Sequence, residues 1–105
     1  MALIHPTTIK ISKLDRRHTG NQWFTHRVMF DGAYPGKAIN LCKAREWLWA
    51  TFGPSREVSS IGYLSKEIPL WSWETNYSYF RLYLSEQALT QFLLIKEQFE
   101  QDYTY

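Results

Sequence analysis

The sequence contains few of the residues that mark a disulfide-rich or a catalytic domain. Cys42 is the single cysteine among 105 residues, so no disulfide can form within the chain, which favours a reducing compartment. Cys42 lies among apolar and helix-favouring residues, and we expect a small buried hydrophobic side chain rather than a nucleophile. The five glycines form no phosphate-binding pattern. A disulfide scaffold is therefore excluded, and no nucleotide-binding loop is indicated.

Metal-binding and acid–base patterns are also missing. The three histidines are scattered, and neither Cys42 nor a carboxylate lies at a ligand spacing from any of them. We expect His26 to be a hydrogen-bonded residue at the edge of the core, and His18 to be a loop residue. Isolated glutamates offer no acid–base pair: Glu46, Glu57, Glu67 and Glu74. We therefore expect a protein that is not an enzyme and that holds no cofactor or metal.

Long apolar runs and a strong net charge are lacking as well. No apolar stretch approaches the length that spans a bilayer, and the start "MALIHPTTIK" has no signal-peptide pattern. Twelve Lys and Arg against ten Asp and Glu give a net charge of +2, which does not by itself indicate nucleic-acid binding. We expect one domain over residues 1–105, in the cytoplasm and without membrane association.

Aromatic residues, in contrast, make up 17% of the chain. Six of them lie between Trp71 and Tyr83, within the stretch "LWSWETNYSYFRLYLS". Tyrosine and tryptophan suit positions where one end of the side chain is buried and the other end meets water. Because these two residue types are enriched in interfaces, the excess of rings indicates a binding surface in addition to a core.

The first half of the chain predicts a hairpin followed by a helix. Residues 7–14 and 23–30 alternate between apolar and polar side chains, and a short polar loop joins them, which indicates two antiparallel strands. Residues 37–52 have apolar side chains at helical spacing, and Gly53-Pro54 ends this helix. Residues 55–70 fit either an edge strand or a loop.

The second half predicts strands followed by a closing helix. "LWSWET" and "SYFRLYL" alternate strongly on either side of Asn76, either as one bent strand or as a hairpin. Ser85 suits the N-cap of a helix over residues 86–101, and Leu84 with Leu89 could form a hydrophobic staple. The order of elements predicts an α+β fold, an antiparallel sheet with two helices packed on one face.

Strand alternation assigns the side chains to two faces of the sheet. The even-numbered residues from 80 to 84 have no polar member, so we expect them to face the helices. Their odd-numbered neighbours include Arg81, whose burial without a partner would be costly, so that set is expected to face away. The predicted core contains Phe24, Val28, Phe30, Leu41, Leu48, Phe80, Leu82, Leu84, Phe92 and Phe99.

The same alternation predicts an aromatic and basic surface on the side without helices. Its members are the rings Trp23, Tyr79 and Tyr83 and the cations Lys10, Arg27 and Arg81. Large exposed apolar patches mark interaction sites. The alternative is an ordinary solvated face on which Tyr and Arg stack as cross-strand pairs. Trp23, Trp71 and Trp73 weigh against that alternative, because these rings must also be accommodated in the fold.

The segment "DRRH" of residues 15–18 places Arg16, Arg17 and His18 at the predicted hairpin tip. One interpretation is a solvated turn. The other is a contact with phosphate or with an acidic protein surface. The sequence leaves both interpretations open.

The "WSW" of residues 71–73 and the stretch "YFRLYLSEQALTQFLLIKEQFE" resemble, in style, small accessory proteins of tailed bacteriophages. The resemblance covers mainly residues 71–100 and includes no catalytic motif, so it transfers no functional residue. It implies a host-directed role, either as an anti-CRISPR-like protein that binds and blocks a host or defence protein, or in phage nucleic-acid metabolism.

We therefore expect a binding protein that docks its aromatic and basic sheet face on a protein partner, since Trp, Tyr and Arg dominate interface hot spots. The first alternative is single-stranded nucleic-acid binding on the same face, with rings stacking bases and cations holding phosphates. The second is a homodimer built by that face or by Trp71 and Trp73.

Overall fold

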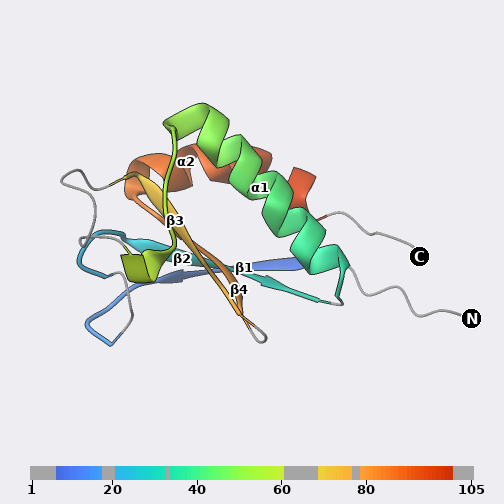
Figure 1. Cartoon of the computed structure of the whole chain (residues 1–105), viewed down its shortest axis with the longest axis horizontal. Coiled ribbons are helices and arrows are strands. Elements are labelled where there is room, and N and C mark those ends of the chain that lie inside the picture. The colour runs from blue at the N-terminus through green and yellow to red at the C-terminus, as the bar shows by residue number, and fades with distance from the viewer. Residues whose placement is uncertain (1–6, 18–20, 33, 61–68, 77–78, 101–105) are drawn as a thin grey trace, which may run out of the picture.

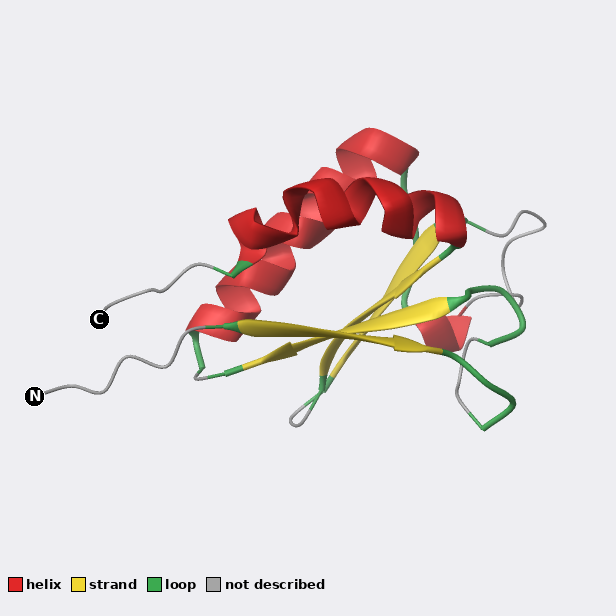
Figure 2. Ribbon diagram, turned by 180° about the vertical axis from the view of Figure 1, so that it is seen from behind, coloured by secondary structure: helices red, strands yellow, loops and turns green. Residues whose placement is uncertain are grey.

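The computed structural model describes residues 7–17, 21–32, 34–60, 69–76 and 79–100. These residues form a four-stranded antiparallel sheet in the order β1-β2-β4-β3. Its strands are β1 (Thr8–Lys13), β2 (His26–Asp31), β3 (Trp71–Thr75) and β4 (Phe80–Leu84). Helix α1 (Gly36–Phe52) and helix α2 (Glu86–Ile95) lie on one side of the sheet (Figures 1 and 2). The predicted α+β fold is confirmed.

Two short 3-10 helices complete the fold, η1 (Val58–Ser60) and η2 (Lys96–Phe99). The predicted helix over 37–52 corresponds to α1, and the predicted helix over 86–101 becomes α2 followed by η2. The strands on either side of Asn76 form a hairpin rather than one bent strand. Residues 55–60 contain η1 and a single parallel bridge from Glu57 to Trp73, and residues 61–68 lie outside the described part.

The main core lies between the sheet and the two helices. Val28 and Leu82 in the central strands are buried against Leu48 of α1 and Phe92 of α2. Nine of the ten predicted core residues belong to this cluster, Phe80 being packed against it while partly exposed. Phe92 and Phe99 stack with their centroids 5.6 Å apart, and Trp47 packs beside both. These rings add to the burial of apolar surface, which is the dominant favourable term in folding.

Phe24 is the exception, and its predicted position in the main core is wrong. Strand β2 begins only at His26, so the alternation does not extend back to Phe24. Phe24 instead packs with Val58 and Tyr83 in a second, smaller cluster. This cluster contains no residue of α1 or α2, and it covers part of the opposite face of the sheet.

The predicted start of α2 is confirmed. The Ser85 hydroxyl accepts a hydrogen bond from the Ala88 amide at 3.3 Å, so it caps one of the amides that lack a partner in the first turn. Ser85 also donates its own amide to the Leu70 carbonyl, which ties the cap to the start of β3.

Cys42 is exposed, so its predicted burial is wrong. The inward side of α1 is formed by Asn40, Leu41, Ala44 and Leu48. This spacing turns Cys42 to the outer side of the helix. No helix within the described residues is long and apolar enough to cross a membrane.

Candidate functional site

The face of the sheet opposite the two helices carries two rows of side chains, which we call the helix-free face. The strand register places Lys10, Met29, Arg81 and Glu74 in one row across β1, β2, β4 and β3. It places Ser12, Arg27, Tyr83 and Ser72 in the neighbouring row. Because side chains at paired positions point to the same side, each row forms a line of direct neighbours.

Glu74 links Arg81 and Tyr83 in a network on this face. The Glu74 Oε1 atom accepts hydrogen bonds from the Arg81 guanidinium at 3.1 Å and from the Tyr83 hydroxyl at 2.8 Å. The Arg81 and Glu74 side chains are 16% and 22% exposed, so water screens this ion pair only in part. The Arg81 guanidinium also lies 3.7 Å from the centre of the Tyr79 ring. The network therefore fixes the position of the arginine before any partner binds.

Tyr83 is buried, with 1% of its surface exposed, and its predicted exposure is wrong. Its ring lies 6.3 Å from that of Phe24 within the second cluster, while its hydroxyl reaches Glu74. Burial, followed by the hydrogen bond to the Glu74 carboxylate, raises the pKa of Tyr83 to about 12. Tyr83 therefore holds Glu74 in place on the helix-free face, and its buried ring is not accessible to a partner.

The other predicted members of the face reach solvent to different degrees. Tyr79 is 40% exposed just before β4, and Arg27 is partly exposed in the middle of the face. Trp23 is partly exposed at its margin, where it packs against the second cluster. Arg81 is also only partly exposed because Glu74 and Tyr79 cover it. The structure thus brings Arg27, Tyr79 and Arg81 together around Met29.

Most cations of this surface have a carboxylate partner. Lys10 forms an ion pair with Asp31 at 3.3 Å, and the hydrogen bond to Lys10 lowers the pKa of the Asp31 carboxyl. At the hairpin tip, Arg17 binds Asp15 at 2.8 Å, and Arg16 is exposed. His18 lies outside the described residues. Arg27 makes no ion pair with any of the described residues.

Trp71 and Trp73 point to the helices, which contradicts the prediction that they could build a dimer surface together. They pair with Leu84 and Leu82 of β4, and Trp71 is fully buried. Trp73 is partly buried beneath Arg45 of α1, whose guanidinium lies 4.1 Å from the ring centre. The Trp71 indole also donates a hydrogen bond to the Gly53 carbonyl. These rings therefore belong to the main core.

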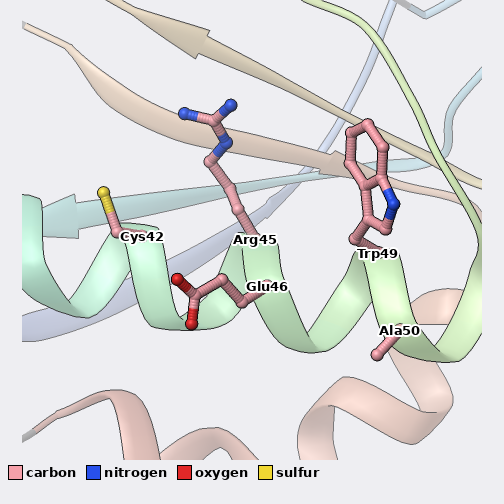
Figure 3. A pocket seen from close by; sticks show the side chains of 5 residues that line it. All are labelled: Cys42, Arg45, Glu46, Trp49 and Ala50. Atoms are coloured by element: carbon pink, nitrogen blue, oxygen red, sulfur yellow. The ribbon is translucent and has the colours of Figure 1, made fainter.

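A shallow hollow of about 470 Å³ lies on the outer side of α1 and is lined by Cys42, Arg45, Glu46, Trp49 and Ala50. Figure 3 shows Cys42, Arg45 and Trp49 projecting from the same side of the helix. Trp49 is 50% exposed beside the hollow. Since one helix supplies every lining residue, the hollow is an open depression and lacks the convergent polar groups of a small-molecule site.

Among the described residues, no group of three His, Cys, Asp or Glu side chains lies close enough together to hold a metal ion. His26 is half-buried, and its Nδ1 atom lies 2.9 Å from the Thr25 hydroxyl, as expected for a hydrogen-bonded residue at the core edge. Glu67 lies outside the described residues.

Glu74 looks isolated in the sequence, so sequence reasoning missed the residue that organises the face. The missing information was the register of the β3–β4 hairpin, which pairs Thr75 with Phe80 and so places Glu74 opposite Arg81. The available signal was an acidic and a basic residue at equal distances on either side of the turn, which places them opposite each other in a hairpin. Met29 lies between Lys10 and Arg81 on this face. Alternation along residues 23–30 puts it on the same side as Arg27, but nothing in the sequence singled it out.

No protein family matches the chain, and no curated protein or solved structure shows significant similarity to it.

Proposed function

We propose that the protein is a binding module that docks its helix-free face on a protein partner. The observation that carries this proposal is the group formed by Arg27, Met29, Tyr79 and Arg81. The group combines a ring, a flexible apolar side chain and two guanidinium groups on a rigid sheet. Residues of these types are enriched in protein interfaces and in their hot spots.

The charges on the face suit a protein surface better than a nucleic acid. Lys10, Arg81 and Arg17 each bind a carboxylate of the chain itself: Asp31, Glu74 and Asp15. Binding to nucleic acid draws its affinity from cations that neutralise phosphates. Lys10 and Arg81 on the face and Arg17 at the hairpin tip are already paired, so they offer less of that attraction, whereas mixed charges are ordinary in a protein interface.

The expected partner carries acidic groups that can meet Arg27 and, at the hairpin tip, Arg16. Neither cation has an ion-pair partner among the described residues. An apolar side chain of the partner would pack on Tyr79 and Met29. Following the resemblance to phage accessory proteins, we infer that this partner is a host or defence protein and that binding acts by steric occlusion of its working surface.

The proposal can be tested by photo-crosslinking. A photoreactive amino acid is placed at Tyr79 or at Lys10 of the helix-free face, and the protein is irradiated in a lysate of the cells in which it acts. The control position is Leu94, which is 82% exposed on α2 on the other side of the molecule. The same covalent adduct should form from both positions on the face and be absent from Leu94.

A second arm measures binding to single-stranded oligonucleotides over a range of salt concentrations. We expect no affinity beyond weak charge attraction. Tight binding that falls steeply with salt would favour the nucleic-acid function over the protein-binding function. Protein adducts that arise from Leu94 but from neither Tyr79 nor Lys10 would also contradict the proposal, because they would place the partner on the helical side.

A further inference from the structure

The two edges of the sheet differ in how well they are covered. At β3, Ser55 donates a hydrogen bond to the Trp71 carbonyl, Ser72 donates to the Arg56 carbonyl, and Glu57 bridges to Trp73. At the other edge, β1 pairs with β2 on one side, and none of the described strands pairs with its outer side. An uncovered edge presents backbone donors and acceptors to any strand that can pair with it.

Two hydrogen bonds show which backbone groups of β1 face outward. The Leu14 amide bonds to the Thr25 carbonyl, so even-numbered amides point toward β2. The Ile9 amide instead points outward, where it meets the Glu100 carboxylate at 3.4 Å. The odd-numbered groups at Ile9, Ile11 and Lys13 therefore form the free edge. Ile11 is partly exposed there, on the helix side of the sheet.

We propose that this edge binds the same edge of a second copy of the chain, in an antiparallel pair centred on Ile11. The resulting two-fold dimer would have one continuous sheet through both copies. Charge and polarity select the register. A pair centred on Lys10 would set Lys10 against itself, and a pair centred on Ser12 would set Ile11 against Lys13. A pair centred on Ile11 sets Ile11 against itself and Lys10 against Ser12.

Glu100 supplies the charge complementarity for this register. In the pair centred on Ile11, Lys13 of the second copy lies directly opposite Ile9, on the helix side of the sheet. Glu100 lies at that position, because its carboxylate meets the Ile9 amide and its other oxygen accepts from Lys96 at 2.9 Å. The Glu100 side chain would turn from the amide to the incoming ammonium group, so that the Ile9 amide can bond to the second copy. Because the dimer is two-fold symmetric, the contact between Glu100 of one copy and Lys13 of the other forms twice.

The oligomeric state of the full chain tests the proposal, measured by sedimentation over a dilution series. The unmodified protein should form a dimer that dissociates on dilution, and Ile11→Pro should be a monomer. Proline at this position removes only an outward-facing amide, so the pairing of β1 with β2 is retained. Circular dichroism and thermal unfolding verify that each variant is folded.

Charge exchange gives a second test that does not depend on proline. Lys13→Glu and Glu100→Lys should each shift the equilibrium to the monomer, and the combined variant should restore the dimer. The proposal is contradicted if the unmodified chain stays monomeric at the highest concentration reached. It is also contradicted if folded single variants remain dimeric, because the dimer would then not depend on contact between Glu100 and Lys13.

A crosslink tests the register directly in a Cys42→Ser background. Residues that exchange both hydrogen bonds across an antiparallel pair have Cα atoms about 5.5 Å apart, which is within disulfide range. Ile11→Cys should therefore give a covalent dimer on mild oxidation. The control Thr8→Cys should not, because the two copies of position 8 lie at opposite ends of the paired strands. A covalent dimer from Thr8→Cys alone would exclude this register.

Discussion

At the scale of single residues, the helix-free face depends on one carboxylate. Glu74 accepts hydrogen bonds from Arg81 and from Tyr83, which come from alternate positions of the adjacent strand. Its position explains how a buried tyrosine hydroxyl and a mostly covered guanidinium can lie side by side on the same strand. An unpaired guanidinium or hydroxyl at this depth would lose hydration without compensation.

Glu74→Ala should lower the free energy of unfolding by roughly 1 to 3 kcal/mol, because two donors would lose their acceptor in a partly buried site. Chemical denaturation measures the change. Glu46→Ala is the matched control, since Glu46 is exposed on α1 and should change stability by no more than about 0.5 kcal/mol. Equal effects of the two substitutions would show that the network adds nothing to stability.

The ionisation of Tyr83 gives a pH-dependent prediction. Its pKa is raised from 10.0 to about 12 in the folded protein, so the unfolded state loses this proton first as the pH rises. The stabilising contribution is complete below about pH 10 and is lost between about pH 10 and 12. Tyrosinate absorbance should show a late-titrating component in the folded protein, and Tyr83→Phe should remove that component. A wild-type titration without a late component would contradict the burial of this hydroxyl.

At the scale of elements, periodicity in the sequence predicted where the helices and strands lie. It was less accurate for the side of the sheet on which residues near the end of a strand pack. Helix α1 and the start of α2 were predicted because their apolar spacing, Gly53 and Ser85 are local signals. Phe24 was assigned to the wrong cluster because it precedes the regular strand β2, which begins at His26. Where a strand ends is decided by contacts with distant segments, here the packing of Phe24 against Val58.

The cap of α2 is a test at this scale. Ser85→Ala should lower the free energy of unfolding by about 1 kcal/mol, because the Ala88 amide would lose its acceptor. Ser85→Asp is the control, since a carboxylate can accept the same bond and also suits the positive end of the helix dipole. Thermal unfolding of the three proteins should rank Ser85→Ala lowest. If Ser85→Asp is destabilised as much as Ser85→Ala, capping is not the cause.

The packing of α2 on the sheet is a second test. Phe92 is fully buried among residues of the main core and stacks on Phe99. Phe92→Ala should cost about 3 to 5 kcal/mol, a large part of the stability of a domain of this size. Leu94→Ala on the same helix is the control, since this side chain is 82% exposed and should change stability by no more than about 0.5 kcal/mol.

At the scale of the whole molecule, the sequence predicted an antiparallel sheet with two helices on one face, and the structure has this architecture. The surface away from the helices was predicted only in part. Alternation placed Arg81 and Tyr83 on the correct side, but it could not show that Val58 and Phe24 cover Tyr83 on that side. This covering depends on how the segment around Val58, which is distant in sequence from Tyr83, folds back over the sheet. Periodicity within a strand contains no information about such a contact.

The proposed binding of a protein partner to the helix-free face is tested by measuring affinity and stability on the same variant. The combined variant Arg27→Ala and Tyr79→Ala removes the guanidinium that makes no ion pair with the described residues and the exposed ring. Calorimetric titration of the partner identified by crosslinking should show a loss of more than about 2 kcal/mol of binding free energy. The melting temperature should change little, because both side chains are at least partly exposed. Unchanged affinity in a folded variant would show that the partner does not bind to the helix-free face.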